Sequence, residues 1–173
     1  VRGAKEAATI DHIAGGRFCL NLVAGWNEKE IAMFGVEQRP HDERYDVADE
    51  WISLAKSLWN RDDEFDWDGR YFPCPAAYSE PKPIQRPGPV IMSAGNSERG
   101  QDFAAKHADL NFVVAPTAQA AGEIARSVKK LAREKYGRDI QVFQETTSTN
   151  DMVERLARDG VKEGVVVFAE SQT

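Results

Sequence analysis

The stretch GGRFCLNLVAGWNEKEIAMFGVEQRPHDERY, residues 15–45, decides the fold. The apolar run over 17–23 predicts a short strand, and a glycine turn over 24–27 ends it. Residues 28–34 predict a short helix. A second helix is expected to begin at His41, where two acidic residues favour its first turn. A strand that leads into helices in this way is typical of an α/β protein.

Polar side chains follow this strand closely. Asn21 stands at its carboxyl end, and Glu30, Arg44 and Tyr45 come soon after it. In α/β barrels the groups just beyond the carboxyl ends of the strands build the active site, so these four residues are candidates for a binding site. The alternative interpretation is a plain strand–helix unit in which Asn21 serves only as a turn residue.

Composition and charge limit the possible functions. The chain has 173 residues, enough for one ordinary domain, and 42% of them are hydrophobic. A net charge of −6 and an isoelectric point near 5.2 argue against a nucleic-acid surface. No apolar run approaches the ~20 residues of a membrane span, and acidic residues near the start argue against a signal peptide. We therefore expect a cytoplasmic protein with neither a nucleic-acid nor a membrane partner.

The cysteines and histidines form no recognisable metal or nucleophile motif. Cys19 and Cys74 are the only cysteines, and their separation favours two free thiols in a reducing cytosol. His12, His41 and His107 are scattered, and none is flanked by a nucleophile pattern. We expect no metal site, and no histidine is assigned a catalytic role.

The clearest helix spans 41–60, where apolar residues recur three or four positions apart. A helix over 3–13 is expected before the central stretch, with glycines after it to stop it. The segment DDEFDWDGRYF, 62–72, predicts a hairpin with Asp68-Gly69 as its turn, and its acidic residues are interpreted as a solvated loop. Five prolines between 73 and 87 predict an extended connector.

Further strand–helix units follow. Residues 89–94 predict a buried strand, and a glycine turn at 95–97 leads it into a helix that ends near His107. Ser97 suits the N-cap of that helix, and free N–H groups there also suit a phosphate. A strand over 110–114, a helix over 117–136 and a strand over 139–143 complete the pattern. This alternation predicts a parallel sheet with covering helices, three or four units where a closed barrel has about eight.

Several motifs in this order resemble one known family. They are ATIDHIAGGRFCLNLVAGWNEKEIAMFGVEQRPHDERYDVADEWISLAKSLW (8–59), FDWDGRYF (65–72) and SEPKPIQRPGPVIMSAGNSERGQDFAAKHADLNFV (79–113). Together they are similar to the bacterial luciferase-like, FMN-dependent monooxygenases, in the branch of the pyrimidine monooxygenase and the sulfone and sulfonate oxidisers. The resemblance covers about residues 3–140. It implies part of a (β/α)8 TIM barrel, apparently incomplete, over residues 1–143.

The same resemblance implies a cofactor and partners. Reduced FMN would be supplied by a separate NAD(P)H-dependent flavin reductase, and one oxygen atom of O2 would pass to a small organic substrate. Asn21 and Glu30 would lie beside the flavin, Arg44 and Tyr45 would meet the ribityl-phosphate side, and Ser97 would hold the phosphate. The resemblance assigns no general acid or base, so the catalytic residues are unknown.

The last residues, 144–173, resemble a different family. ETTSTNDMVERLARDGVKEGVVVFAESQT (145–173) is similar to the first catalytic segment of the biotin protein ligases. That resemblance implies biotin contacts at Ser148, Thr149, Asn150 and Gln172, in a C-terminal αβ segment. The ligase's glycine- and arginine-rich nucleotide loop does not follow Gln172, so we expect no ligase activity. The alternative is one more αβ unit of the same sheet.

Three hypotheses follow from the sequence. The first is a luciferase-like monooxygenase or a fragment of one. The second is a biotin-binding, ligase-derived module, and the third is a non-catalytic α/β fragment. Because a half barrel exposes sheet edges that invite pairing, we also expect a homo-oligomer.

Overall fold

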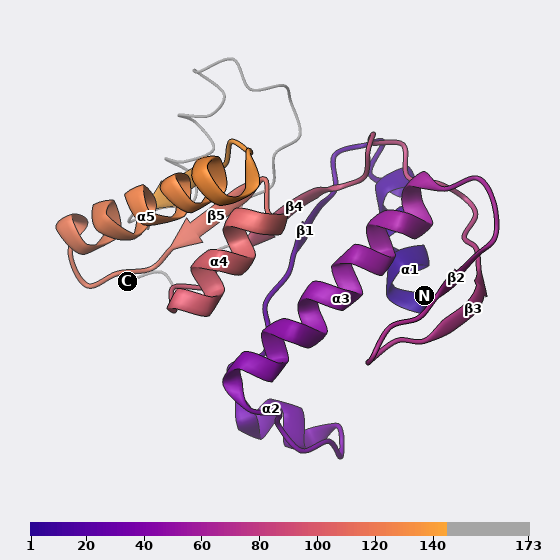
Figure 1. Cartoon of the computed structure of the whole chain (residues 1–173), viewed down its shortest axis with the longest axis horizontal. Coiled ribbons are helices and arrows are strands. Elements are labelled where there is room, and N and C mark those ends of the chain that lie inside the picture. The colour runs from indigo at the N-terminus through magenta and orange to yellow at the C-terminus, as the bar shows by residue number, and fades with distance from the viewer. Residues whose placement is uncertain (145–173) are drawn as a thin grey trace.

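The computed structural model describes residues 1–144, whose helices and strands are drawn in Figure 1. In chain order they are α1 (Arg2–Ile13), β1 (Cys19–Asn21), α2 (Glu28–Met33), α3 (His41–Asn60), β2 (Phe65–Trp67), β3 (Cys74–Ala77), β4 (Val90–Ser93), α4 (Glu98–His107), β5 (Leu110–Val113), α5 (Ala118–Tyr136) and β6 (Gln141–Gln144). Each helix and strand expected from the sequence up to residue 144 is present, within a few residues of its expected bounds, apart from the second strand of the hairpin.

Four strands form one sheet in the order β1-β4-β5-β6, and every neighbouring pair is parallel. Asn21 pairs with Met92, and Ser93 pairs with Asn111. Parallel strands need crossover connections. Helix α4 connects β4 to β5 and α5 connects β5 to β6, and these two helices pack against each other and against the sheet (Figure 1), whereas the chain from β1 to β4 passes through α2, α3 and the hairpin. The predicted parallel sheet with covering helices is confirmed. All four carboxyl ends lie at one edge of this sheet.

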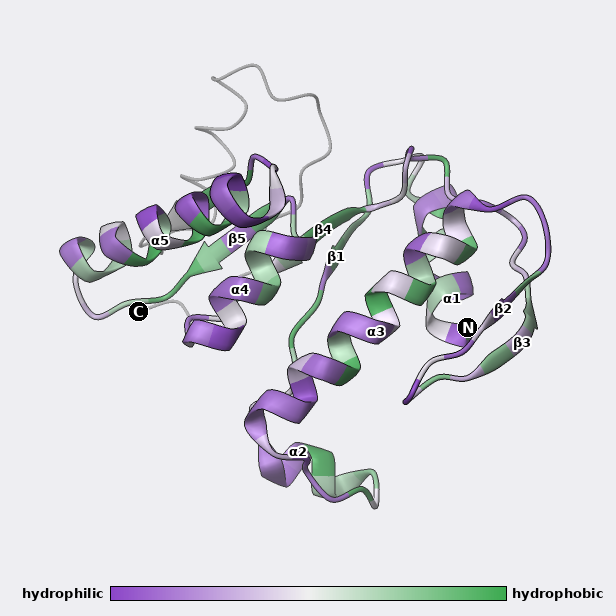
Figure 2. Ribbon diagram, in the orientation of Figure 1, coloured by the Kyte–Doolittle hydropathy of each residue, from purple (hydrophilic) through white to green (hydrophobic). Residues whose placement is uncertain are grey.

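The long helix α3 connects the two sides of the molecule, with α1 against one flank and α4 against the other (Figure 1). Hydrophobic and hydrophilic residues follow one another along α3 in Figure 2, and most of its buried residues recur three or four positions apart, as the sequence predicts. Ile52 and Leu58 are at most 1% exposed, and burial of each contributes roughly 1.5–3 kcal/mol. The Trp59 indole Nε1 donates to the Ala4 carbonyl at 2.9 Å and so joins α1 to α3.

The proline-rich connector is held by buried polar groups. The Asp11 carboxylate is fully buried and accepts bonds from the backbone N–H and the side-chain amide of Gln85, at 2.9 and 2.7 Å. The buried Lys82 ammonium donates to the carbonyls of Leu58 and Arg61 at the end of α3, where a helix leaves carbonyls without partners. These contacts attach an extended segment to both helices.

The hairpin is present, but the predicted two-residue turn at Asp68-Gly69 is wrong. Strands β2 and β3 are antiparallel, and residues 68–73 form the loop between them. The Glu50 carboxylate on α3 accepts backbone N–H bonds from Tyr71 and Phe72 at 2.7–3.1 Å. These two residues therefore bond to a side chain instead of a strand, and β3 begins only at Cys74. Turn chemistry in the sequence could not reveal that distant carboxylate.

The helix caps follow the sequence. Ser97 Oγ accepts from the Gly100 N–H at 3.1 Å, and Thr117 Oγ1 accepts from the Ala120 N–H at 3.2 Å. Each cap satisfies a backbone donor that the first helical turn leaves free. Gly137 ends α5 with a φ of 62°, a left-handed conformation that glycine adopts without strain.

Candidate functional site

The candidate site begins at the carboxyl edge of the sheet. Asn21 ends β1 with an exposed side chain, and the turn after β4 contains Gly95. The N-terminus of α4 lies just beyond this turn. The edge where several parallel strands end is where α/β barrels place their ligands.

Tyr45 on α3 reaches this edge from the neighbouring layer. A Cβ added at Gly95 would lie 2.7 Å from the Tyr45 hydroxyl and 2.8 Å from the Gly100 Cα. A Cβ at Gly100 would lie 2.6 Å from the same hydroxyl. Both glycines are therefore needed for the close approach of the β4–α4 turn, α4 and the tyrosine. Tyr45 is 8% exposed, and its hydroxyl lies beside both glycines.

Ser97 lies at the same helix N-terminus and contacts a histidine. Its Oγ is 3.2 Å from Nε2 of His41, and Nδ1 of His41 is 2.7 Å from a carboxylate oxygen of Asp42. The His41 ring also packs edge-on against the Tyr45 ring, with centroids 5.2 Å apart. Ser97, His41 and Tyr45 thus lie together at the N-terminus of α4, where free N–H groups favour an anion.

An open polar pocket of about 570 Å³ adjoins these groups. Its charged lining residues are Asp42, Glu98, Arg99, Asp102 and Lys135, with Leu131 at one side. Burial by itself would raise the pKa of Asp102, but hydrogen bonds from Lys135 and Tyr136 lower it below its usual value. Arg99 donates to Asp46 at 2.6 Å, and this contact raises the pKa of Arg99 despite its partial burial. The cations of this pocket are charged and already paired with carboxylates.

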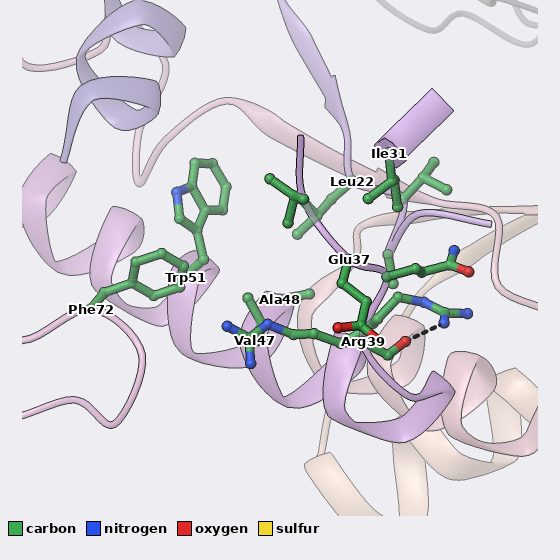
Figure 3. A pocket seen from close by; sticks show the side chains of 13 residues that line it. Leu22, Ile31, Glu37, Arg39, Val47, Ala48, Trp51 and Phe72 are labelled. Atoms are coloured by element: carbon green, nitrogen blue, oxygen red, sulfur yellow. Dashed lines mark hydrogen bonds between the residues drawn. The ribbon is translucent and has the colours of Figure 1, made fainter. Parts of the chain in front are cut away.

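Arg44 is next to Tyr45 in the sequence but faces a different pocket, shown in Figure 3. That pocket has a volume of about 340 Å³ and is mainly apolar, with Leu22, Ala24, Val47, Trp51 and Phe72 in its wall. Arg44 Nη1 donates to the Arg39 carbonyl at 2.7 Å, and its buried Nε has no hydrogen-bond partner within residues 1–144. Successive helical residues point about 100° apart, which explains why Arg44 and Tyr45 diverge.

The remaining candidates lie apart from this cluster. Glu30 is exposed on α2, where its backbone N–H bonds to the Asn27 side chain, and it lines neither pocket. Asn21 also lines neither pocket, although the next residue, Leu22, contributes to the apolar one. Among the predicted residues, the described structure brings Tyr45 and Ser97 to one site and places Arg44 at another. Asn21 and Glu30 remain predictions.

His41 and Gly100 are site residues that the sequence analysis did not identify. The only available signal for His41 was its spacing of four from Tyr45, which places the two side chains on one face of α3. Within residues 1–144, no group of three or more His, Cys, Asp or Glu side chains could hold a metal ion. None of the helices in this part of the chain is long and apolar enough to cross a membrane.

The parallel strands, the covering helices and the polar groups at the carboxyl edge define a segment of an α/β barrel. The family described as luciferase-like monooxygenase matches this sequence over residues 1–157. The chain belongs to that family.

Curated relatives and solved structures agree with this assignment. The FMNH2-dependent dimethylsulfone monooxygenase of Pseudomonas putida is 38% identical over 109 residues, 63% of this chain and 30% of that protein. The pyrimidine monooxygenase RutA of Klebsiella pneumoniae (strain 342) is 40% identical over 146 residues, 79% of this chain and 38% of that protein. The chain therefore spans less than half the length of these relatives.

Two crystal structures share the fold. DmoA from Hyphomicrobium sulfonivorans superposes with a TM-score of 0.71 at 26% identity, over 91% of this chain and 40% of that one. The riboflavin lyase RcaE, solved with modified FMN and riboflavin, gives a TM-score of 0.75 at 25% identity, over 90% of this chain and 41% of that one.

The C-terminal predictions lie outside the described residues. These are Ser148, Thr149, Asn150 and Gln172, together with the predicted domain 144–173. The family match continues to residue 157, past the predicted change of family at residue 144. The resemblance to biotin protein ligases stays a prediction.

Proposed function

We propose that this chain forms part of a flavin-dependent monooxygenase that uses reduced FMN and O2 to oxidise a small organic substrate. The observation that carries the proposal is the convergence of the Tyr45 hydroxyl, the Ser97 cap and the α4 N-terminus at the carboxyl edge of a parallel sheet. Relatives named as FMNH2-dependent and pyrimidine monooxygenases support the choice of chemistry. When bound, reduced FMN supplies the reaction with O2 from which one oxygen atom passes to the substrate.

The residues at the α4 N-terminus fit the phosphate of FMN. Ser97 offers a hydroxyl, Tyr45 offers a second hydroxyl beside Gly95 and Gly100, and the first turn of α4 offers backbone N–H groups. Gly95 and Gly100 keep this approach free of Cβ atoms. In this assignment Ser97 and Tyr45 hold the phosphate and fix the position of the flavin.

The other candidates have supporting roles in the proposal. Asn21 and Glu30 are assigned to the flavin side, because both follow the carboxyl end of β1. The family resemblance assigns Arg44 to the ribityl-phosphate side. In the structure Arg44 lines the apolar pocket, where its buried Nε has no hydrogen-bond partner within residues 1–144 and could donate to an anion. The apolar pocket beside Arg44 would exclude water from this side of the site.

The proposal also covers the reductase partner, the cellular location and the oligomeric state. A separate flavin reductase would supply the reduced cofactor, and two free cysteines favour a cytoplasmic setting. A homo-oligomer is proposed from the apolar side chains Trp26, Met33 and Phe34, which are 71–84% exposed around α2. Sedimentation velocity tests this last point, and a monodisperse monomer would contradict it.

The test of the function is a titration of the purified 173-residue chain with FMN, followed by flavin fluorescence. Ser97→Ala and Tyr45→Phe each remove a hydroxyl from the proposed phosphate site. Losing a hydrogen bond to a charged group costs roughly 1.5–3 kcal/mol, so each variant is expected to bind about 10–100-fold more weakly. Arg44→Ala tests whether the residue at the apolar pocket also contributes to FMN binding.

The matched control is Thr117→Ala. Thr117 caps α5 with the same geometry by which Ser97 caps α4, yet it lines neither pocket. We expect this variant to lose a similar amount of stability and to bind FMN as the parent does. If FMN up to millimolar concentration does not bind to the folded chain, or if both caps affect binding equally, the proposed site is wrong. If FMN binds as expected, the next experiment is an oxygen-transfer assay with an added flavin reductase.

A further inference from the structure

We propose that Phe103 is a positioning residue of the candidate site, whose ring fixes the Tyr45 ring and so keeps the Tyr45 hydroxyl at the N-terminus of α4. The inference rests on the proposed function, because it concerns how firmly that hydroxyl is held for FMN. Phe103 lines neither pocket and its side chain has no polar atom, so it acts on FMN only through its neighbours.

Phe103 and Tyr45 meet where α4 packs against α3 (Figure 1). Their ring centroids are 5.7 Å apart, and the planes of the rings are inclined by 53°. Both side chains are buried, with 1% of Phe103 and 8% of Tyr45 exposed. Aromatic pairs at this separation attract each other beyond the simple burial of their surface, so this contact defines a preferred position for the tyrosine ring.

A buried histidine holds Phe103 in turn. The centroid of the His107 ring lies 5.2 Å from that of Phe103, and His107 Nε2 is 2.8 Å from a carboxylate oxygen of Asp49. Tyr45 and Asp49 are four positions apart on α3, as Phe103 and His107 are on α4. Side chains four apart share one face of a helix, so each helix presents two of these groups to the other. The two pairs together fix the register of α4 against α3.

The other sides of Tyr45 are also occupied. The ring of His41, an exposed residue, packs edge-on against it with centroids 5.2 Å apart. At the hydroxyl end, a Cβ at Gly95 or Gly100 would lie 2.6–2.7 Å from the oxygen. Of the two ring contacts, Phe103 is therefore the one inside the core. A smaller side chain at position 103 would open a space into which the tyrosine ring can move.

A hydroxyl that moves in this way binds a ligand less well. Hydrogen bonds weaken steeply with angle and distance, and a binding site needs its side chains held within about 0.5 Å of the productive position. Phe103→Leu removes the ring that supports Tyr45. We expect this variant to bind FMN about 3–10-fold more weakly, roughly half on a logarithmic scale of the loss expected when Tyr45→Phe removes the hydroxyl altogether.

A double-mutant cycle of Phe103→Leu and Tyr45→Phe tests the inference. The parent, the two single variants and the double variant, each shown to be folded by urea denaturation, are titrated with FMN and followed by flavin fluorescence. If Phe103 acts through the tyrosine hydroxyl, the double variant binds FMN as Tyr45→Phe alone does. If the two losses of affinity multiply instead, Phe103 contributes only general packing. The inference is then overturned, while the FMN site stands.

Ile52→Val is the matched control. Ile52 is fully buried on α3 and lines neither pocket, so its truncation lowers stability without touching the site. We expect a lower urea midpoint and the parental FMN affinity, and an equal loss of affinity in Ile52→Val and Phe103→Leu would overturn the inference.

Phe103→Met takes the place of Phe103→Leu in the same cycle if the leucine variant does not fold, because methionine fills more of the space and has no ring. If Tyr45→Phe binds FMN as the parent does, the hydroxyl has no role and the inference fails, although FMN binding stands. If the folded parent does not bind FMN, the proposed function fails and the inference fails with it.

Discussion

Replacing Gly100 with alanine tests the close approach on which the site depends. An added Cβ would lie 2.6 Å from the Tyr45 hydroxyl, 2.8 Å from the Gly95 Cα and 2.9 Å from the Gly95 carbonyl carbon. Two of these three atoms belong to backbone, so rotation of one side chain cannot remove the overlap. Overpacking of this kind costs typically about 1–3 kcal/mol.

The higher helix propensity of alanine offsets part of this loss of unfolding free energy. Gly100 is in the first turn of α4, and alanine is favoured over glycine in helices by up to about 1 kcal/mol. The expected net loss of unfolding free energy is therefore roughly 1 kcal/mol, measured by urea denaturation at 25 °C. We also expect weaker FMN binding, because the added methyl displaces the Tyr45 hydroxyl from the proposed phosphate site.

Making Gly100→Ala in a Tyr45→Phe variant separates the overlap with the tyrosine hydroxyl from the overlap with the Gly95 backbone. Without the hydroxyl, only the contacts with Gly95 remain, so Gly100→Ala should cost less in this background than in the parent. A Gly100→Ala protein that is more stable than the parent and binds FMN equally well would refute the argument. Helix propensity would then be the dominant effect, and the glycine would not be needed for packing.

Three further predictions concern groups outside the site. Lys82→Met should lower the unfolding free energy by about 1–3 kcal/mol, because the carbonyls of Leu58 and Arg61 lose their shared donor, and an unchanged urea midpoint would contradict this. Burial lowers the pKa of His107 to about 4 despite its bond to Asp49, so the unfolded chain binds a proton that the folded chain rejects between about pH 6.5 and 4. The free energy of unfolding should therefore fall by about 2 kcal/mol from pH 7 to pH 5, and it should fall less in the His107→Gln variant. Equal losses in both proteins would exclude His107 as the cause. Burial, with a contribution from Asp109, raises the pKa of Cys19 to about 11, so its thiolate fraction at pH 8 should be about 100-fold below that of free cysteine. In the Cys74→Ser variant, iodoacetamide should alkylate Cys19 more slowly than free cysteine by a similar factor. A rate equal to that of free cysteine would contradict this prediction.

Local chemistry in the sequence was sufficient for most of the fold. The apolar spacing of 41–60 predicted α3, because a helix needs one buried stripe and that stripe is visible in the order of residues. Ser97 and Gly137 marked helix ends for similarly local reasons, a side-chain cap and a left-handed residue. The alternation of strands and helices predicted the parallel sheet.

What the sequence did not determine depends on residues far apart in the chain. The second strand of the hairpin was misplaced because Glu50, 21 positions before Tyr71, takes the N–H groups that a tight hairpin would have used. His41 contacts Ser97, which is 56 residues away in the chain. Arg44 and Tyr45 looked like one paired motif, but the turn of α3 directs Arg44 to the apolar pocket and Tyr45 to the glycines of the β4–α4 turn. Periodicity records which face of a helix is buried, whereas only the packing of α3 against α4 decides which partner that face meets.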